Sequence, residues 1–380
     1  MGKVNTADRD FFVALVRAGV GHPLPEGFAM PAEVEWKAAF RIARRQALSA
    51  VAYDGVDALA GMGLISQSQR MEDKLRFRWI ASVIRNFDQK YEDYRARIGE
   101  LAGFYNARGF RMMVLKGYGL SLNWPRPSHR PCGDIDIWQF GQYREADAAL
   151  SREKGIAIDN SHHHHTVFDF GEYAVENHYD LVNVHANRSN AAIEKILKSL
   201  AMDDSFFTEI DGERVWLPSP DLNALFLLRH TMLHFSAEGI TLRHLLDWGF
   251  FVEKHASEVD AALFREVTGK YYMTRFASCL STLCVKVLGF DPAPFARLLP
   301  SATDPALPLM VDDDLLSKIM DDIFNPEFDP HLPDALVPRV IMKFKRWAAY
   351  GWKRRLCYRE GPVSSFIIRA WAHILKPSSI

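Results

Sequence analysis

The chain has 380 residues, of which 48% are hydrophobic and 24% are charged, proportions that are ordinary for a globular protein of two or three domains. Its formal net charge of −1 excludes a broad positive field, so we expect no stable nucleic-acid complex. The four cysteines form no paired motif, and residues 1–20 mix charged with apolar side chains, unlike a secretory signal. We therefore expect a protein of the reducing cytoplasm without a membrane-spanning helix.

The first hundred residues are predicted to be helical. Apolar residues recur at helical spacing over 38–52 and again over 79–101, and both runs contain few glycines and prolines. No chemical motif falls in this region. We interpret residues 1–100 as a helical N-terminal region that serves for packing.

After residue 109 the pattern changes to that of short strands separated by loops and one helix. Apolar and polar residues alternate in these strands, and glycines and prolines punctuate them. We expect residues 101–215 to form the core that carries the chemistry. The predicted strands cover 111–115, 134–140, 166–170 and 173–185, with a predicted helix at 143–154.

From Leu217 the pattern is helical again. The triplet Ser-Pro-Asp at 219–221 favours a helix start, because Ser caps a helix, Pro suits its first position and an acid suits its first turn. This helix is predicted to reach about Phe235, and a second one is predicted over 241–255. Residues 216–380 are therefore expected to form a helical C-terminal domain.

Two carboxylates dominate the search for chemistry. Asp134 and Asp136 lie two residues apart on a predicted strand, so they project to the same side, while Ile135 and Ile137 face the core. Neighbouring carboxylates repel each other and raise each other's pKa, a cost that a divalent cation removes. The alternative is an exposed edge strand with two solvated acids.

Lys116 and Gly117 follow an earlier predicted strand. A backbone turn and an ammonium group at a strand end can hold phosphates. Arg130 and Pro131 fix the approach of the chain to the two acids. A nucleotide bound through divalent metal is therefore a coherent interpretation of this region.

Several segments resemble one family in particular. Val114-Leu115-Lys116-Gly117 and the run from Arg130 to Ile137, Arg-Pro-Cys-Gly-Asp-Ile-Asp-Ile, resemble the signature of the "uncharacterised nucleotidyltransferase" family. The family belongs to the DNA polymerase β-like superfamily and is common in bacteria, often near surface-polysaccharide genes. The likeness covers roughly residues 30–255. Its weaker parts are Val-Glu-Asn-His-Tyr at 175–179, Leu-Leu-Arg-His at 227–230 and Arg-His-Leu-Leu-Asp-Trp at 243–248.

The resemblance implies an α+β fold, with a mixed sheet flanked by helices and with helical N- and C-terminal regions. It implies Mg²⁺ or Mn²⁺ held by Asp134, Asp136 and a third acid, which would be catalytic residues as well as metal ligands. The implied reaction transfers a nucleoside monophosphate from an NTP to a hydroxyl acceptor and releases pyrophosphate. The residues expected to contact the nucleotide are Lys116, Gly117, Arg130 and His178.

The third acid is assigned by comparison with the family pattern. Glu176 fits best, because an acid two residues before His and then an aromatic resembles the family's later strand. Alternation would place 174, 176, 178 and 180 on one face, so Asp180 remains a candidate, whereas Asn183 has the opposite parity. The superfamily usually has Ser or Gly after the glycine of its first motif, but Tyr118 follows Gly117 here.

Histidines occur in two suggestive groups. In a strand, the run at 162–165 would turn at most two imidazoles to one side, with His164 roughly opposite His178, and we interpret the run as a solvated strand end. His230 and His234 have the spacing of a zinc helix but lack the glutamate of such motifs. We interpret them as helix-packing residues.

Charged residues near the C-terminus give a further option. Arg243 and Asp247 are expected to form an intrahelical ion pair, unless Arg243 reaches a phosphate. The segment Arg339–Lys376 is basic and rich in aromatic residues. It is interpreted as a solvated helical face, with peripheral contact to an anionic membrane or a polyanionic substrate as alternatives.

Two functions follow from these observations. The first is a metal-dependent nucleotidyltransferase acting on an NTP and an unknown hydroxyl acceptor. The alternative is a catalytically weak nucleotide-binding or interaction protein, peripheral to the membrane in surface-polysaccharide assembly. A third carboxylate close to Asp134 and Asp136 favours the enzyme.

Overall fold

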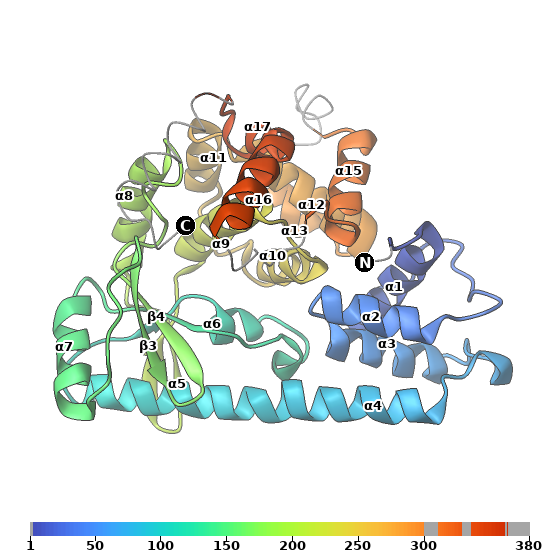
Figure 1. Ribbon diagram of the computed structural model, residues 1–380, viewed down its shortest axis with the longest axis horizontal. Helices are drawn as coiled ribbons and strands as arrows, with labels where there is room; N and C mark the ends of the chain where they lie inside the picture. Colours follow the sequence, from blue (N-terminus) through green and yellow to red (C-terminus); the bar gives the residue numbers. More distant parts are fainter. Residues whose placement is uncertain (1–2, 300–310, 329–335, 362, 364–380) are drawn as a thin grey trace.

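The computed structural model of the protein describes residues 3–299, 311–328, 336–361 and 363. A six-stranded mixed sheet lies at one end of the molecule and a helical bundle at the other, and further helices cover both (Figure 1). The predicted α+β fold with a mixed sheet flanked by helices is confirmed.

The sheet places chemically distinct segments of the chain side by side. Its order is β3-β4-β2-β1-β6-β5, with the central strand β2 parallel to β4 and antiparallel to β1. β1 is parallel to β6, and the two outer pairs are antiparallel hairpins. The strands are β1 (Met113–Val114), β2 (Ile135–Trp138), β3 (His165–Phe170), β4 (Tyr173–His178), β5 (Phe207–Ile210) and β6 (Glu213–Trp216).

Two features of the sheet differ from the sequence prediction. β4 ends at His178, not near residue 185, because the backbone N–H groups of Tyr179 and Asp180 both donate to the carbonyl of His164 and turn the chain. The β5–β6 hairpin was not predicted. Its turn is the dipeptide Asp211-Gly212, in which both residues have positive φ, and this is a recognised hairpin signal.

The N-terminal bundle consists of three helices with a short 3₁₀ turn after them. The predicted helical run over 38–52 is interrupted at Ala47, which has a φ of 56°. At this break the buried Gln46 side chain accepts from the Leu242 N–H and donates to the Ile323 carbonyl, so it joins the bundle to the C-terminal half. The elements are α1 (Thr6–Gly19), α2 (Trp36–Arg45), α3 (Ser49–Gly61) and η1 (Gln67–Gln69).

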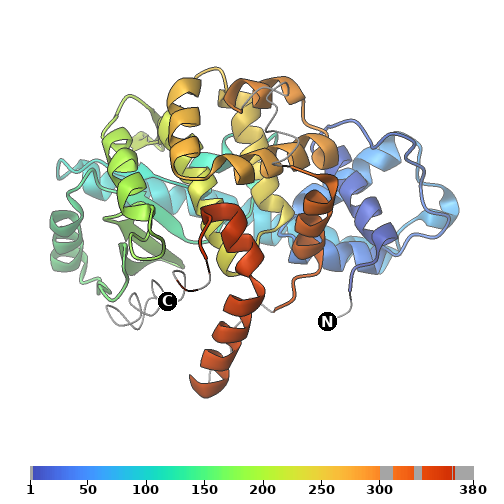
Figure 2. The same ribbon diagram turned by 90° about the horizontal axis from the view of Figure 1, so that it is seen from above.

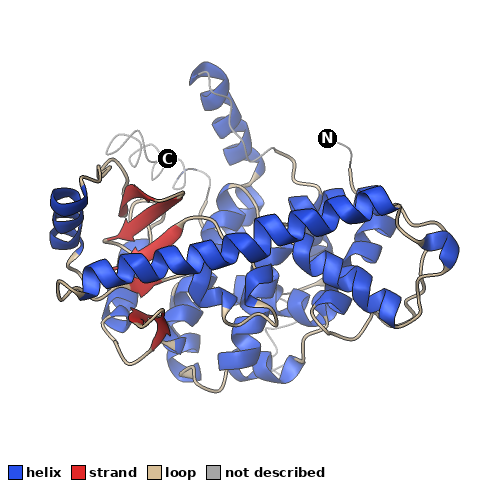
Figure 3. Ribbon diagram, turned by 90° about the horizontal axis from the view of Figure 1, so that it is seen from below, coloured by secondary structure: helices blue, strands red, loops and turns tan. Residues whose placement is uncertain are grey.

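One long helix connects the bundle to the sheet. It runs beneath both, and its middle turn is a π-helix (Figures 1 and 3). The run predicted over 79–101 falls within it. Its three segments are α4 (Asp73–Val83), η2 (Ile84–Gln89) and α5 (Lys90–Asn106).

Shorter helices flank the sheet and the loop that enters it. The predicted helix over 143–154 is present with those limits. Trp124 and His129, in the loop before β2, are both buried. These elements are α6 (Gly117–Ser121), η3 (Pro127–His129), α7 (Tyr143–Lys154) and α8 (Asn190–Ala201).

The C-terminal half is helical, as predicted. Ser219 caps the helix that follows it by accepting from the Leu222 N–H, and the helix predicted over 241–255 begins one residue later. Among the described residues, none of the helices combines the length and apolar character needed to cross a bilayer. The helices are α9 (Pro220–Ala237), α10 (Leu242–His255), α11 (Ala261–Lys270), α12 (Thr274–Leu288), α13 (Pro292–Leu298), α15 (Asp313–Phe324), α16 (Leu336–Ala349) and α17 (Gly351–Tyr358).

Helix α16 stands away from the body of the molecule as an arm (Figure 2). Three large apolar side chains on it are about half exposed, those of Val340, Ile341 and Phe344. Much of the basic segment Arg339–Lys376 beyond residue 361 lies outside the described residues.

The contact between α1 and α3 yields a test of the fold. A Cβ atom at Gly55 would lie 2.0 Å from the Leu15 carbonyl oxygen, which is backbone and cannot rotate away. We expect Gly55→Ala to lower the free energy of unfolding by roughly 1–3 kcal/mol, as overpacking does. Gly61→Ala in the same helix is the control, because a Cβ there meets nothing within 4 Å. Urea unfolding should show Gly61→Ala at or slightly above wild type, and equal losses in both variants would contradict the packing explanation.

Candidate metal and nucleotide site

A cavity of about 710 Å³ opens between the sheet and the C-terminal helices. One wall comes from the ends of β2 and β4 and the turn after β1, and the other from α9 and α10. This volume is in the range of sites that bind ligands of nucleotide size. The ionisable residues that line it include Lys116, Asp134, Asp136, His164, His165, Glu176, His178, His230, His234 and Arg243.

Asp136 is the buried centre of the site, with 2% of its surface exposed. Its Oδ1 atom lies 2.6 Å from Lys116 Nζ and 3.0 Å from His178 Nε2. Burial alone would raise the pKa of Asp136, but the charge of Lys116 and the hydrogen bond from His178 hold it below its ordinary value. Asp136 is therefore ionised and compensated by two cationic groups.

Those two partners respond to the same charge. Burial would lower the pKa of His178, but hydrogen bonds to Asp136 and Glu176 outweigh it and raise the pKa to about 9. Burial likewise opposes the charge of Lys116, and Asp136 reverses this, so the pKa of Lys116 is raised. Both groups carry a proton at neutral pH.

Glu176 lies directly beside Asp136 on the neighbouring strand. The parallel β2–β4 register pairs these two residues, so their side chains project from the same face of the sheet. Glu176 Oε2 is 3.6 Å from His178 Nε2, and ligand atoms of Asp136, Glu176 and His178 all lie within 4.8 Å of one another. The structure thus brings the expected third acid to Asp136.

Asp134 precedes β2 and is exposed at the mouth of the cavity. Its backbone carbonyl accepts a hydrogen bond of 2.8 Å from the hydroxyl of Tyr94, on α5. Desolvation by the cavity walls, and then the charge of Asp136, raise the pKa of the Asp134 carboxyl. A cation between these carboxylates would relieve that repulsion.

Gly117 is required by its contact with Tyr94. Its φ of 42° is left-handed, and a Cβ would lie 2.1 Å from the Tyr94 hydroxyl oxygen. The same tyrosine therefore positions the Lys116-Gly117 turn and the Asp134 backbone. Sequence reasoning did not find Tyr94, because nothing in its helical surroundings separates it from a packing residue.

Arg130, predicted to contact the nucleotide, is 4% exposed and engaged within the protein. It forms a two-pronged pair with Asp247, with Nε–Oδ1 at 2.8 Å and Nη2–Oδ2 at 3.0 Å, and its Nη1 donates to the Gly117 carbonyl. Arg130 thereby ties the loop before β2 to α10. The predicted pair of Arg243 with Asp247 is also present, at 3.4 Å.

The rival third acids are placed elsewhere. Because β4 ends at His178, alternation does not extend to Asp180, whose carboxylate pairs with Lys198. The prediction that Asp180 borders the acids is therefore wrong. Asn183 lies on the cavity wall, where its side-chain oxygen accepts from the His185 N–H.

The histidine run is not the solvated strand end that we predicted. His165, not His164, pairs with His178 across the β3–β4 hairpin, and His165 is 6% exposed. Burial lowers the pKa of His165 to about 4 and that of His164 to about 2. All three imidazoles line the cavity.

His230 and His234 face the same cavity from α9. Their Nε2 atoms are 3.0 Å apart, and His234 Nδ1 is 2.7 Å from Glu238 Oε1. Burial holds the pKa of His230 well below its ordinary value. They therefore form part of the cavity wall, beyond the packing role that we predicted.

Comparison with known proteins agrees with this geometry. Residues 32–289 match a family described as uncharacterised nucleotidyltransferase. The chain belongs to this nucleotidyltransferase family. The family resemblance found in the sequence is confirmed. No curated protein matches this nucleotidyltransferase-family chain.

One solved structure is similar to this nucleotidyltransferase-family protein. It is an antigenic nucleotidyltransferase-like protein from Paracoccidioides brasiliensis, with 14% sequence identity and a TM-score of 0.30. The similarity covers 42% of this chain and 74% of that chain.

The Arg130–Asp247 pair yields a stability prediction. Asp247→Ala would leave the Arg130 guanidinium buried without a counter-charge, so we expect a loss of about 3–5 kcal/mol in the free energy of unfolding. The control is Glu72→Ala, which removes an exposed pair with Lys37 at 3.6 Å and should cost no more than about 1 kcal/mol. Denaturant unfolding measures both, and similar small losses would mean that the buried pair is not a structural constraint.

Proposed function

We propose that this protein is a nucleotidyltransferase that moves a nucleoside monophosphate from an NTP to a hydroxyl acceptor. The proposal rests on the side-by-side carboxylates of Asp136 and Glu176, which point into a cavity of nucleotide size beside Lys116. In this reaction the acceptor oxygen bonds to the α-phosphorus, the bond to pyrophosphate breaks, and the acceptor hydroxyl loses its proton.

The carboxylates fit a divalent metal. Asp136 and Glu176 offer oxygen ligands on one face of the sheet, and Asp134 adds a third at the cavity mouth. Oxygen ligands with room for water and phosphates suit Mg²⁺, and Mn²⁺ accepts similar sites. Bound to these three acids, such a metal would supply the positive charge that activates a hydroxyl and stabilises the leaving pyrophosphate.

The remaining residues bind and orient charge. Lys116 is an ammonium held 2.6 Å from Asp136, at a turn whose backbone approaches the cavity through Gly117. It can therefore supply positive charge to phosphates as a fixed point charge. His178 holds a proton between two carboxylates and keeps them in place. Arg130 serves as a positioning residue, because it fixes the Gly117 carbonyl.

The opposite wall suits the acceptor or the triphosphate tail. Arg243 on α10 is partly exposed, with 26% of its side chain accessible, and it lines the cavity together with His230 and His234. These groups are hydrogen-bond donors and acceptors facing the carboxylates. They give the site two chemically different walls, as a reaction between two substrates requires.

Joint binding of metal and nucleotide tests the proposal. We expect the wild type to bind Mg²⁺ and NTP cooperatively by calorimetry, and Asp136→Asn to abolish this joint binding. Asp134→Asn is a second variant, because Asp134 is exposed and its loss should leave folding intact. Asp169→Asn is the matched control, an exposed acid on β3 that is not part of the cavity lining.

The possible results separate the two functions considered. If Asp134→Asn and Asp169→Asn bind Mg²⁺–NTP as tightly as wild type, the carboxylates are not the metal site. If wild type binds Mg²⁺–NTP but a screen of labelled NTPs with hydroxyl acceptors gives no pyrophosphate, the nucleotide-binding alternative replaces the enzyme.

A second role is favoured by helix α16. Val340, Ile341 and Phe344 are exposed on an arm that also carries Lys343 and Lys345 (Figure 2). An amphipathic helix with lysines beside an apolar face is suited to an anionic lipid surface, where both terms add. We propose that this arm makes a peripheral membrane contact.

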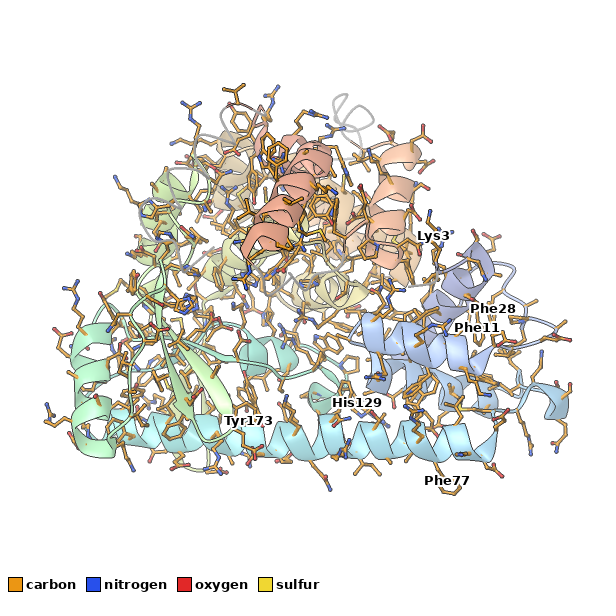
Figure 4. All side chains as sticks on the ribbon, in the orientation of Figure 1. Lys3, Phe11, Phe28, Phe77, His129 and Tyr173 are labelled. Carbon is orange, nitrogen blue, oxygen red and sulfur yellow. The ribbon has the colours of Figure 1, made fainter. Side chains whose placement is uncertain are left out.

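Vesicle sedimentation tests the membrane contact. We expect binding to phosphatidylserine-containing vesicles that weakens with salt, and Phe344→Glu to reduce it at least about tenfold, because a charge replaces buried apolar area. The control is Phe77→Glu, which changes an isolated phenylalanine, 73% exposed, on the outer side of α4 (Figure 4). Equal binding by both variants would exclude α16 as the contact.

A further inference from the structure

Three imidazoles meet at the edge of the sheet beside the carboxylates. His164 and His165 end the histidine run, and His178 ends β4 across the hairpin. The ring centroids are 4.3 Å apart for His164–His165, 5.5 Å for His164–His178 and 5.2 Å for His165–His178. One ligand nitrogen from each lies within 4.8 Å of the others. The cluster therefore has the dimensions of a metal site.

Two of these imidazoles contain buried nitrogens without a hydrogen-bond partner. His164 Nδ1 and His165 Nδ1 are both inaccessible and unpaired, and the acceptor atom closest to the latter among the ion pairs, Glu176 Oε2, is 3.7 Å away. Buried polar atoms are almost always satisfied, so a pair of such atoms calls for an explanation. A ligand that accepts electron pairs would satisfy both.

The third imidazole is oriented as metal-binding histidines are. His178 Nδ1 lies 3.2 Å from the Asp180 carbonyl oxygen, to which it donates, and this directs Nε2 toward the cluster and toward Asp136. A backbone carbonyl on the far nitrogen is the usual outer partner of a metal-ligating histidine. His178 is thus shared between the carboxylates and the imidazole cluster.

We propose that His164, His165 and His178 bind a divalent transition-metal ion of the Zn²⁺ or Co²⁺ type. Imidazole suits these ions and is a poor ligand for Mg²⁺, which prefers oxygen. The three residues line the cavity, so a fourth position is open to water or substrate, as in catalytic zinc sites. The site is chemically distinct from the carboxylate site and explains the histidine run.

Cobalt binding tests the proposal on the full-length protein. Wild type should bind one Co²⁺ with intense visible ligand-field bands typical of a nitrogen-rich, low-coordinate site. His164→Ala and His165→Ala should each weaken this binding at least about a hundredfold, because even an outer partner of a metal ligand is worth ten- to a hundredfold. The control is His163→Ala, a neighbour in the same run whose ring packs on His185.

The outcomes separate this site from the carboxylate site. Asp134→Asn should lose Mg²⁺–NTP binding and retain the Co²⁺ bands, whereas His164→Ala should do the reverse. If His164→Ala and His163→Ala bind Co²⁺ like wild type, the proposal is overturned. If the alanine variants do not fold, pulsed EPR of the Cu²⁺-loaded wild type decides the matter by counting coordinated imidazoles, and fewer than two would overturn it.

Discussion

The site depends on one buried ion pair. Arg130 enters from the loop before β2 and Asp247 from α10, and neither is more than 4% exposed. Removing two charges from water is costly, and only the two-pronged geometry, with Trp124 as a further donor to Asp247, makes the pair tolerable. The pair therefore fixes the sheet and the helical wall at one separation, and that separation is the cavity. Because the same guanidinium also holds the Gly117 carbonyl, the wall spacing and the turn after β1 are set together.

The charges around Asp136 follow from the same economy of burial. A buried carboxylate persists only with compensation, and Lys116 and His178 provide it from two different strand ends. This compensation also primes the site for a substrate that carries anions, since phosphates add negative charge where the chain already holds positive charge. The side chains that face Asp136 thus serve folding and ligand binding by one mechanism.

The sequence was informative wherever local rules decide the outcome. Alternation along β2 places Asp136 and the isoleucines correctly, and the helix start at Ser219 follows from cap chemistry alone. The spacing of an acid before His178 was enough to choose Glu176. Local rules failed where tertiary contacts decide: the end of β4 is set by two hydrogen bonds to the His164 carbonyl, and this one turn shifts the histidine register and removes Asp180 from the site. No periodicity within 173–185 contains that information.

The π turn in the long helix has a consequence for how its length can vary. From Leu75 through Trp79, Val83 and Phe87 to Tyr91 the buried side chains recur every four residues, which on a regular α-helix would drift by about 40° at each step. The wider turn η2 absorbs this drift just where the helix passes from the core of the bundle to the core of the sheet. Deleting one residue there would restore a regular helix but rotate everything after it by about 100°, taking the Tyr94 hydroxyl away from the Asp134 carbonyl. The outer surface of this helix is free to change in composition, yet its residue count is fixed.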